Sequence, residues 1–102
     1  MRNYRLTYQA EGDLLDILDY IAQDNPDAAD RVRDRFEDAF AKLADMPGIG
    51  HFREDLLDER HKFWHVHSYV IVYRWRESPI QILAIVHGAR NLEAFFTRRG
   101  IS

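Results

Sequence analysis

The chain has 102 residues, of which 46% are hydrophobic and 13% aromatic, enough apolar material to predict one domain spanning residues 1–102. Cysteine is absent, which excludes disulfide scaffolds, zinc–thiolate sites and thiol catalysis. No apolar run is longer than 69–73, which is far below the roughly 20 residues that a membrane helix needs. Residues 1–20 also lack a signal-peptide pattern, so we expect a cytoplasmic protein with no membrane partner.

The net charge of −3 conceals an asymmetry along the chain. Residues 1–46 hold six basic and eleven acidic side chains, whereas residues 60–102 hold seven basic and two acidic ones. These two segments therefore carry equal and opposite charge, which indicates two surfaces with different partners. Because the total charge is negative, the chain does not have the bulk positive field that grips nucleic acid, and we expect no direct nucleic-acid binding.

Alternation of apolar and polar residues predicts a first strand over 4–8. Apolar residues then recur every three or four positions up to Ile21, which predicts an amphipathic helix with Thr7 as its N-cap. On its solvent side we expect the acidic residues Glu11, Asp13, Asp16 and Asp19.

A second helix is predicted after the break at 24–27. Asn25 can cap it, and Pro26 suits its first position, where a proline needs no hydrogen-bond donor. Met46-Pro47-Gly48 ends it, since proline cannot continue a helix. Two helices joined by so short a link should pack as an antiparallel hairpin.

Beyond a loosely ordered connection over 49–59, the hydrophobic period becomes two. This predicts three strands and two turns, followed by one or two helical turns over 91–96; the strands are 62–66, 69–75 and 80–87, and the turns 67–68 and 76–79. The expected fold is α+β with the order β-α-α-β-β-β, in which the helical hairpin packs on a mainly antiparallel sheet of three or four strands.

Candidate catalytic groups lie near the strand ends. Arg74 closes the central strand, and His87 and Arg90 follow the last one. Such a set could hold phosphate, with arginine as a bidentate clamp and histidine as acid or base. Adjacent antiparallel strands run in opposite directions, so Arg74 need not share an end of the sheet with His87. The alternative is that these are exposed charges or members of ion pairs.

His65 and His67 have a spacing that would place both on one face of a strand, as metal ligands require. A third ligand would have to come from His61 or His51, and the apolar neighbours favour an ordinary strand edge instead. We therefore expect neither a metal nor a cofactor.

Aromatic residues are more numerous than a small sheet needs; they include Phe63, Trp64, Trp75, Phe95 and Phe96. We expect most in the core, while some could line a groove for an extended or helical peptide. A basic groove with an aromatic floor would suit an acidic, disordered partner.

Several motifs in this order resemble the ParE branch of the RelE/ParE toxin superfamily, over about residues 4–91. They are Tyr4-Arg5-Leu6-Thr7, Ala10 with Asp13-Leu14 and Ile17, Tyr20-Ile21-Ala22, Asn25-Pro26 with Ala28-Ala29, the loop 47–56, the strand 69–74, and 82–86 followed by His87-Gly88-Ala89-Arg90. Each motif is weak alone, and together they point to the superfamily.

The resemblance implies the toxin of a type II toxin–antitoxin module, held inactive in a hetero-oligomer by a ParD-like antitoxin. The C-terminal segment of that antitoxin would wrap the toxin along its groove and helical hairpin. ParE-like toxins are associated with poisoning DNA gyrase rather than with chemistry of their own. A degenerate toxin that only binds antitoxin is a further alternative.

The RelE-like branch instead cleaves ribosome-bound mRNA with clustered basic residues. This sequence has two lysines, neither in 47–59, and its last tyrosine is Tyr73. A ribonuclease would have to use Arg53, Arg74, His87 and Arg90. We therefore favour the gyrase-directed interpretation. The partner-binding candidates are Arg53, Trp64, Arg74, Trp75, Arg76, His87 and Arg90.

Overall fold

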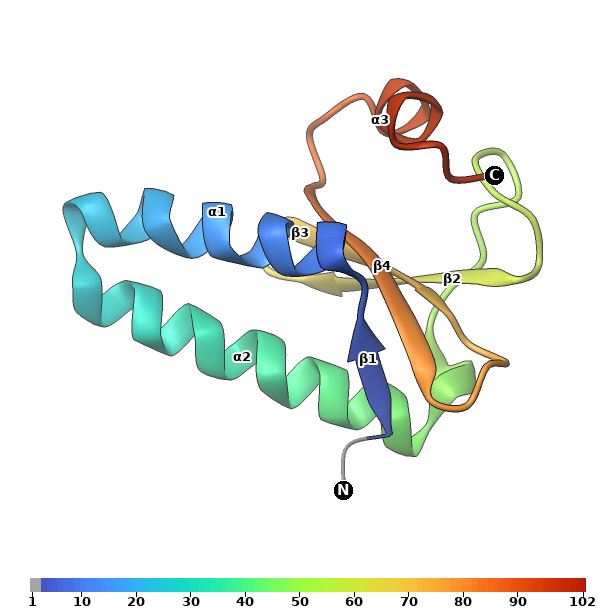
Figure 1. Ribbon diagram of the computed structural model, residues 1–102, viewed down its shortest axis with the longest axis horizontal. Helices are drawn as coiled ribbons and strands as arrows, with labels where there is room; N and C mark the ends of the chain where they lie inside the picture. Colours follow the sequence, from blue (N-terminus) through green and yellow to red (C-terminus); the bar gives the residue numbers. More distant parts are fainter. Residues whose placement is uncertain (1–2) are drawn as a thin grey trace.

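A computed structural model describes residues 3–102 of the chain. The elements in chain order are β1 (Tyr4–Leu6), α1 (Tyr8–Asp24), α2 (Pro26–Asp45), the 3₁₀ turn η1 (Pro47–Ile49), β2 (His61–Val66), β3 (Tyr69–Arg74), β4 (Ile80–His87) and α3 (Leu92–Arg99). Figure 1 shows α1 and α2 as a hairpin beside the sheet, which confirms the predicted α+β fold and its element order. No helix within 3–102 has the length and apolar character needed to cross a membrane.

The sheet has the strand order β1-β4-β3-β2. The pairs β2–β3 and β3–β4 are antiparallel, as predicted, and β1 joins the meander by pairing in parallel with β4. The register of β3 and β4 shifts once: Val72 lies opposite Ala84 and Tyr73 opposite Ile82. Leu83 is thus a bulge residue, and the bulge turns Ile82 and Ile85 toward the same face.

The helical caps form where the sequence predicts them. Thr7 Oγ1 accepts from the Ala10 amide at 3.1 Å, and Asn25 Oδ1 accepts from the Ala28 amide at 3.0 Å. The predicted strand over 4–8 is two residues too long, because the cap at Thr7 makes Tyr8 the first residue of α1. The other strand boundaries differ from the prediction by at most one residue.

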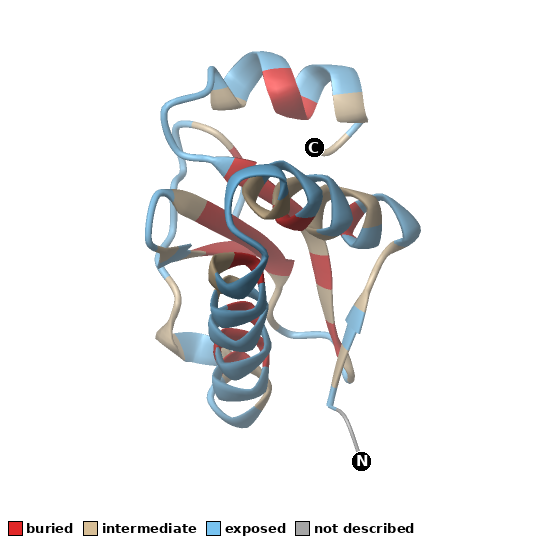
Figure 2. Ribbon diagram, turned by 90° about the vertical axis from the view of Figure 1, so that its left-hand side faces the viewer, coloured by how far each residue is buried: buried red, intermediate tan, exposed pale blue. Residues whose placement is uncertain are grey.

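Each face of the sheet has its own apolar core. The hairpin face contains Phe36, Phe40, Leu43, Ile71, Tyr73 and Ile82 among its buried residues. The opposite face packs Phe63, Val72 and Val86 against Phe95 and Phe96 of α3. Figure 2 shows the buried residues on the strands and on the inner sides of the helices, with α3 above the sheet.

The C-terminal helix is longer than the one or two turns predicted over 91–96. Asn91 caps it through a bond from the Ala94 amide, and Gly100 ends it in the left-handed conformation, with φ of 78°. It continues to Arg99 because the C-cap is Gly100, whose N–H donates to Phe96 O and Thr97 O.

The prediction that Asp13 lies on the solvent side of α1 is wrong. Its carboxylate accepts from the Ile85 amide at 3.1 Å and from Arg99 at 2.7 and 3.2 Å, and only 14% of the side chain is exposed. The reason is tertiary: β1 ends at Leu6, so the rest of β4 has no strand on that side and its backbone groups need other partners. Glu11, Asp16 and Asp19 are exposed, as predicted.

Candidate functional site

Aromatic rings and cations gather where β2 begins and β3 ends. We call this set, made of Phe52, Lys62, Trp75 and Arg76, with Trp64 joined to it through the stacked ring of His51, the aromatic–cation platform. Its members come from the loop after η1, from β2 and from the turn after β3. The sequence predicted Trp64, Trp75 and Arg76 as partner contacts and did not single out Phe52 or Lys62.

Lys62 is the centre of the platform. Its side chain is buried, and its Nζ donates to Gly48 O at 2.8 Å and to Gly50 O at 3.3 Å. The same Nζ lies 4.3 Å from the ring centroid of Phe52 and 4.6 Å from that of Trp75. Both rings present electron-rich faces to the ammonium, which forms no ion pair with a carboxylate of residues 3–102.

Tyr73 fixes the loop that carries Phe52. Its hydroxyl donates to Pro47 O at 2.6 Å and accepts from the Gly50 amide at 3.1 Å. Burial raises the pKa of this hydroxyl above its usual value, so it stays protonated and can donate. A Cβ on Gly50 would lie 2.4 Å from the Tyr73 oxygen, so this close approach requires glycine.

Two further contacts order the platform. His51 forms an isolated antiparallel bridge with Phe63, and its ring stacks on Trp64 with the centroids 6.0 Å apart. Trp75 Nε1 donates to Glu59 O at 2.9 Å, while the Arg76 guanidinium lies 4.5 Å from the Trp75 centroid. Phe52 remains 43% exposed. The result is a rigid, partly exposed aromatic surface with cations beside it, a composition that protein-binding hot spots share.

The four residues that a ribonuclease would use are not brought together. Arg74 is at the end of β3, opposite Gln81, while His87 is opposite Tyr69 at the other end of that strand. Tyr69 and Arg74 are five residues apart in β3, which corresponds to about 17 Å along the strand. Arg90 follows His87 and lies over Phe95, at 5.2 Å from its centroid, and Arg53 is in the loop before β2.

Three of the seven basic residues within 60–102 are in ion pairs. Arg74 pairs with Glu77, Arg60 with Asp58 and Arg99 with Asp13. In the loop, Arg53 pairs with Asp55 at 2.8 Å, and this hydrogen bond raises the pKa of Arg53 above its usual value. Within 60–102, three exposed arginines form no ion pair with any residue of 3–102. They are Arg76, Arg90 and Arg98.

The histidines considered as metal ligands have separate surroundings. His65 is exposed on the edge strand β2, and His67, with φ of 53°, contacts Arg35 from the turn. His61 is fully buried, with Nδ1 at 3.3 Å from Asp58 Oδ1. Burial lowers the pKa of His61 below its usual value, against the opposing effect of Asp58. Within 3–102, no three potential ligands are grouped around a metal position.

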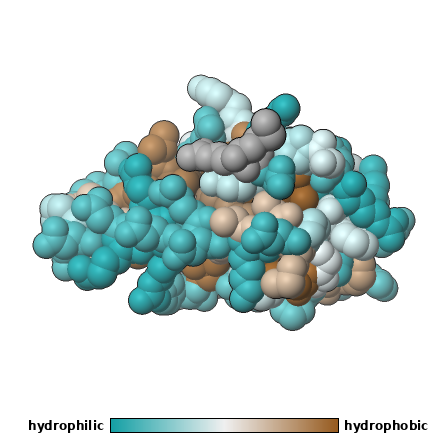
Figure 3. Space-filling model, turned by 90° about the horizontal axis from the view of Figure 1, so that it is seen from below, coloured by the Kyte–Doolittle hydropathy of each residue, from teal (hydrophilic) through white to brown (hydrophobic). Residues whose placement is uncertain are grey.

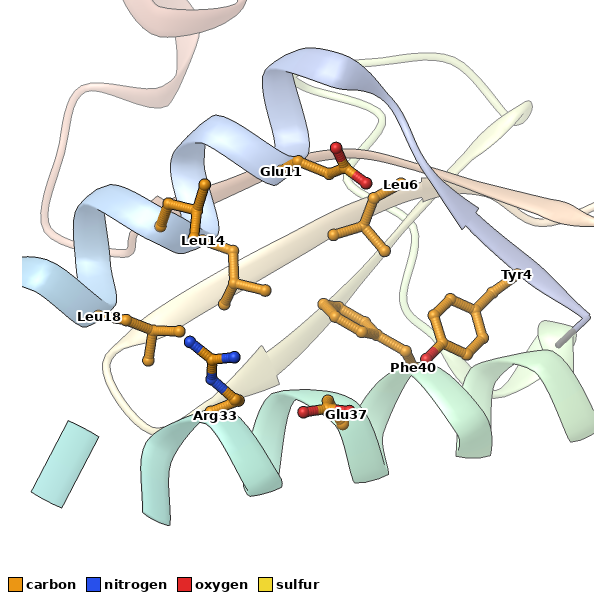
Figure 4. A pocket seen from close by; sticks show the side chains of 9 residues that line it. Tyr4, Leu6, Glu11, Leu14, Leu18, Arg33, Glu37 and Phe40 are labelled. Atoms are coloured by element: carbon orange, nitrogen blue, oxygen red, sulfur yellow. The ribbon is translucent and has the colours of Figure 1, made fainter. Parts of the chain in front are cut away.

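A second feature is a groove of about 280 Å³ between α1, α2 and β1, which we call the hairpin groove. Its lining is formed by Tyr4, Leu6, Leu14, Leu15, Leu18 and Phe40, with Glu11, Arg33 and Glu37 as charged members. Figure 4 shows these side chains converging from the two helices and the strand. The face in Figure 3, by contrast, is largely hydrophilic with small, separate apolar areas.

The sequence contains a sign that the Lys62 side chain is buried. Alternation along β2 places Lys62, Trp64 and Val66 on one face, and the latter two pack on the hairpin-side core. A lysine at such a position needs a buried acceptor. The acceptors, however, are carbonyls of a loop whose path the sequence does not specify.

Comparisons with known proteins identify the family of the chain. Residues 4–92 match the family model described as the ParE toxin of the type II toxin-antitoxin system, parDE. The chain is also similar to Toxin ParE2 from two strains of Mycobacterium tuberculosis, CDC 1551 / Oshkosh and ATCC 25618 / H37Rv. Each is 32% identical over 94 residues, which cover 91% of this chain and 88% of the relative. The chain therefore belongs to the ParE toxin family of type II toxin–antitoxin systems.

Proposed function

We propose that this chain is a toxin that is neutralised by a cognate ParD-like antitoxin and that binds and poisons DNA gyrase in the cytoplasm. In this proposal it catalyses no reaction of its own. Membership of the ParE family supports the toxin role and implies an antitoxin partner. The gyrase target is carried over from what the family resemblance implies.

The observation that supports a binding rather than a catalytic role is the separation of Arg74 from His87. Cleavage of RNA needs cations around one phosphate and a base within hydrogen-bond reach of the attacking hydroxyl. Arg74 is the last residue of β3, while His87, the last residue of β4, lies opposite the first residue of β3. The Arg53 and Arg74 charges are already countered by Asp55 and Glu77. The aromatic–cation platform, in contrast, is ordered in advance for contact with a protein.

The hairpin groove is the proposed site of the antitoxin's C-terminal segment. Its apolar lining suits an amphipathic segment laid between the helices, and Arg33 offers a partner for an acidic side chain. Acidic residues elsewhere in the antitoxin would complement Arg76, Arg90 and Arg98, which form no ion pair with any residue of 3–102. The resulting hetero-oligomer should weaken as ionic strength rises.

Controlled expression in a bacterial host tests the proposal. Induction of the chain alone should arrest growth, and co-expression of the adjacent antitoxin gene should restore it. Robust growth without the antitoxin would contradict the toxin role and favour a degenerate toxin that only binds. In a translating extract mRNA should stay intact, and cleavage lost on His87→Ala or Arg90→Ala would instead support the RelE-like ribonuclease.

A further inference from the structure

The surroundings of Lys62 are unusual for a lysine. Only 8% of the residue is exposed, and within 3–102 its ammonium has no carboxylate in an ion pair. An ammonium removed from water must recover its lost hydration. Here two carbonyl oxygens, of Gly48 and Gly50, and two ring faces, of Phe52 and Trp75, supply that stabilisation.

We propose that this enclosure is a binding site for primary alkylammonium ions, in which the chain's own Lys62 is the resident ligand. The two carbonyls recognise N–H groups, and the two rings recognise positive charge. A neutral alcohol of the same shape could donate one hydrogen bond to a carbonyl, but it lacks the charge that the rings recognise and the donor for the second carbonyl. The site is therefore selective for charge as well as for size.

The walls of the site are held by contacts that do not involve Lys62. Tyr73 fixes Gly50, and the His51–Phe63 bridge fixes the chain just before Phe52. Trp75 is anchored through its Nε1 to Glu59 O. Removing the lysine side chain should thus leave a formed cavity rather than a collapsed one, and a preformed cavity keeps its affinity for a ligand.

Lys62 is also a positioning residue for the aromatic–cation platform. Its ammonium lies beside the exposed Phe52 ring and the Trp75 ring, so it adds one link between the loop and the turn after β3, each of which also has its own anchor. This inference does not depend on the proposed function, because it concerns a ligand of the isolated chain. Its test uses neither antitoxin nor gyrase.

Lys62→Ala removes three carbons and the ammonium, which n-propylammonium replaces atom for atom. We expect the variant to melt at a lower temperature than the wild type. Added n-propylammonium should raise its melting temperature in a saturable way. The recovery should reach about 5 °C or more at ten times the dissociation constant. Tryptophan fluorescence should change over the same concentrations, since Trp75 forms a wall.

Three controls make the result decisive. The wild type should not respond, because its site is filled, and 1-propanol should not rescue Lys62→Ala, because it carries no charge. Lys62→Met fills the cavity without charge, so it should be less stable than the wild type and insensitive to n-propylammonium. Equal rescue by 1-propanol, an equal shift of the wild type, or absence of rescue in folded Lys62→Ala would overturn the proposal. If Lys62→Ala does not fold, wild-type stability in Lys62→Met would overturn it.

Discussion

Arg99 of α3 reaches across to Asp13 of α1, with Nη2 2.7 Å from Oδ1, although 85 residues separate them along the chain. The same carboxylate accepts from the Ile85 amide, and Thr7 donates its backbone N–H to Ile82 O. The Asp13 side chain and the Thr7 backbone thereby pair with the backbone groups at the edge of β4, beyond the point where β1 ends. One carboxylate joins the hairpin, the sheet and the C-terminal helix.

Asp13→Asn tests this junction. The amide keeps the size of the side chain but leaves Arg99, 17% exposed, without a counter-charge, so we expect a loss of about 2 kcal/mol in the free energy of unfolding. Urea denaturation measures it. Asp16→Asn, on the same helix but exposed, is the matched control and should change stability by less than about 0.5 kcal/mol. Equal stability of both variants would contradict the assigned role of Asp13.

Two glycines should respond to alanine in opposite directions. A Cβ at Gly50 would lie 2.4 Å from Tyr73 Oη and 3.0 Å from Phe63 O, so Gly50→Ala should cost about 1–3 kcal/mol through overpacking. Among residues 3–102, a Cβ added to Gly12 would meet nothing within 4 Å outside its own stretch of α1, and Gly12→Ala should gain about 1 kcal/mol from helix propensity. Thermal melting compares the two. A stable Gly50→Ala variant would refute the tight loop anchoring at Tyr73.

Stability should decrease in mildly acidic solution because of His61. Burial lowers its pKa in the folded chain below the ordinary value of 6.5, with Arg74 and Arg60 adding to the effect and Asp58 opposing it. The unfolded chain then binds the proton first, so this contribution is complete above pH 6.5 and is lost as the pH falls below it. Through His61 alone, the free energy of unfolding should change by at most about 1.4 kcal/mol per pH unit.

Denaturation between pH 5.5 and 7.5 measures that slope. His61→Asn, which keeps a hydrogen-bonding group near Asp58, should reduce it, whereas the exposed His65→Asn should leave it unchanged. Equal slopes in the wild type and His61→Asn would show that another group titrates.

The antitoxin assignment can be tested at the hairpin groove. Leu15 is 54% exposed and lines the groove, so Leu15→Arg should weaken antitoxin binding about tenfold or more while the chain stays folded. Tyr20→Arg is the matched control, because this residue of α1 is 69% exposed and does not line the groove. Isothermal titration gives both affinities. Unchanged binding of Leu15→Arg would place the antitoxin elsewhere.

Features that depend on local sequence were predictable. Spacing and residue type predict the caps at Thr7 and Asn25 and the proline at the start of α2. They also predict the order of the helices and strands along the chain. Asp13 was misplaced because helical periodicity describes a helix in isolation, and only the tertiary structure reveals the unpaired edge of β4. The Leu83 bulge and the carbonyls that hold Lys62 likewise depend on how distant segments meet.

The arginine–histidine set shows the same limit. The sequence places Arg74 and His87 near strand ends and leaves open which ends coincide. The register settles this, since Arg74 faces Gln81 and His87 faces Tyr69. A gathering of cations along the sequence is therefore not a gathering in space, and three of the seven in residues 60–102 are joined to carboxylates.

The most direct measurement is a gyrase supercoiling assay with the purified, antitoxin-free chain. A protein that binds its target without turnover should block supercoiling or stabilise cleaved DNA in proportion to its amount, reaching full effect near a stoichiometric ratio. Addition of the antitoxin should restore the activity. Normal supercoiling and no cleaved DNA at stoichiometric excess of a folded chain would contradict the account.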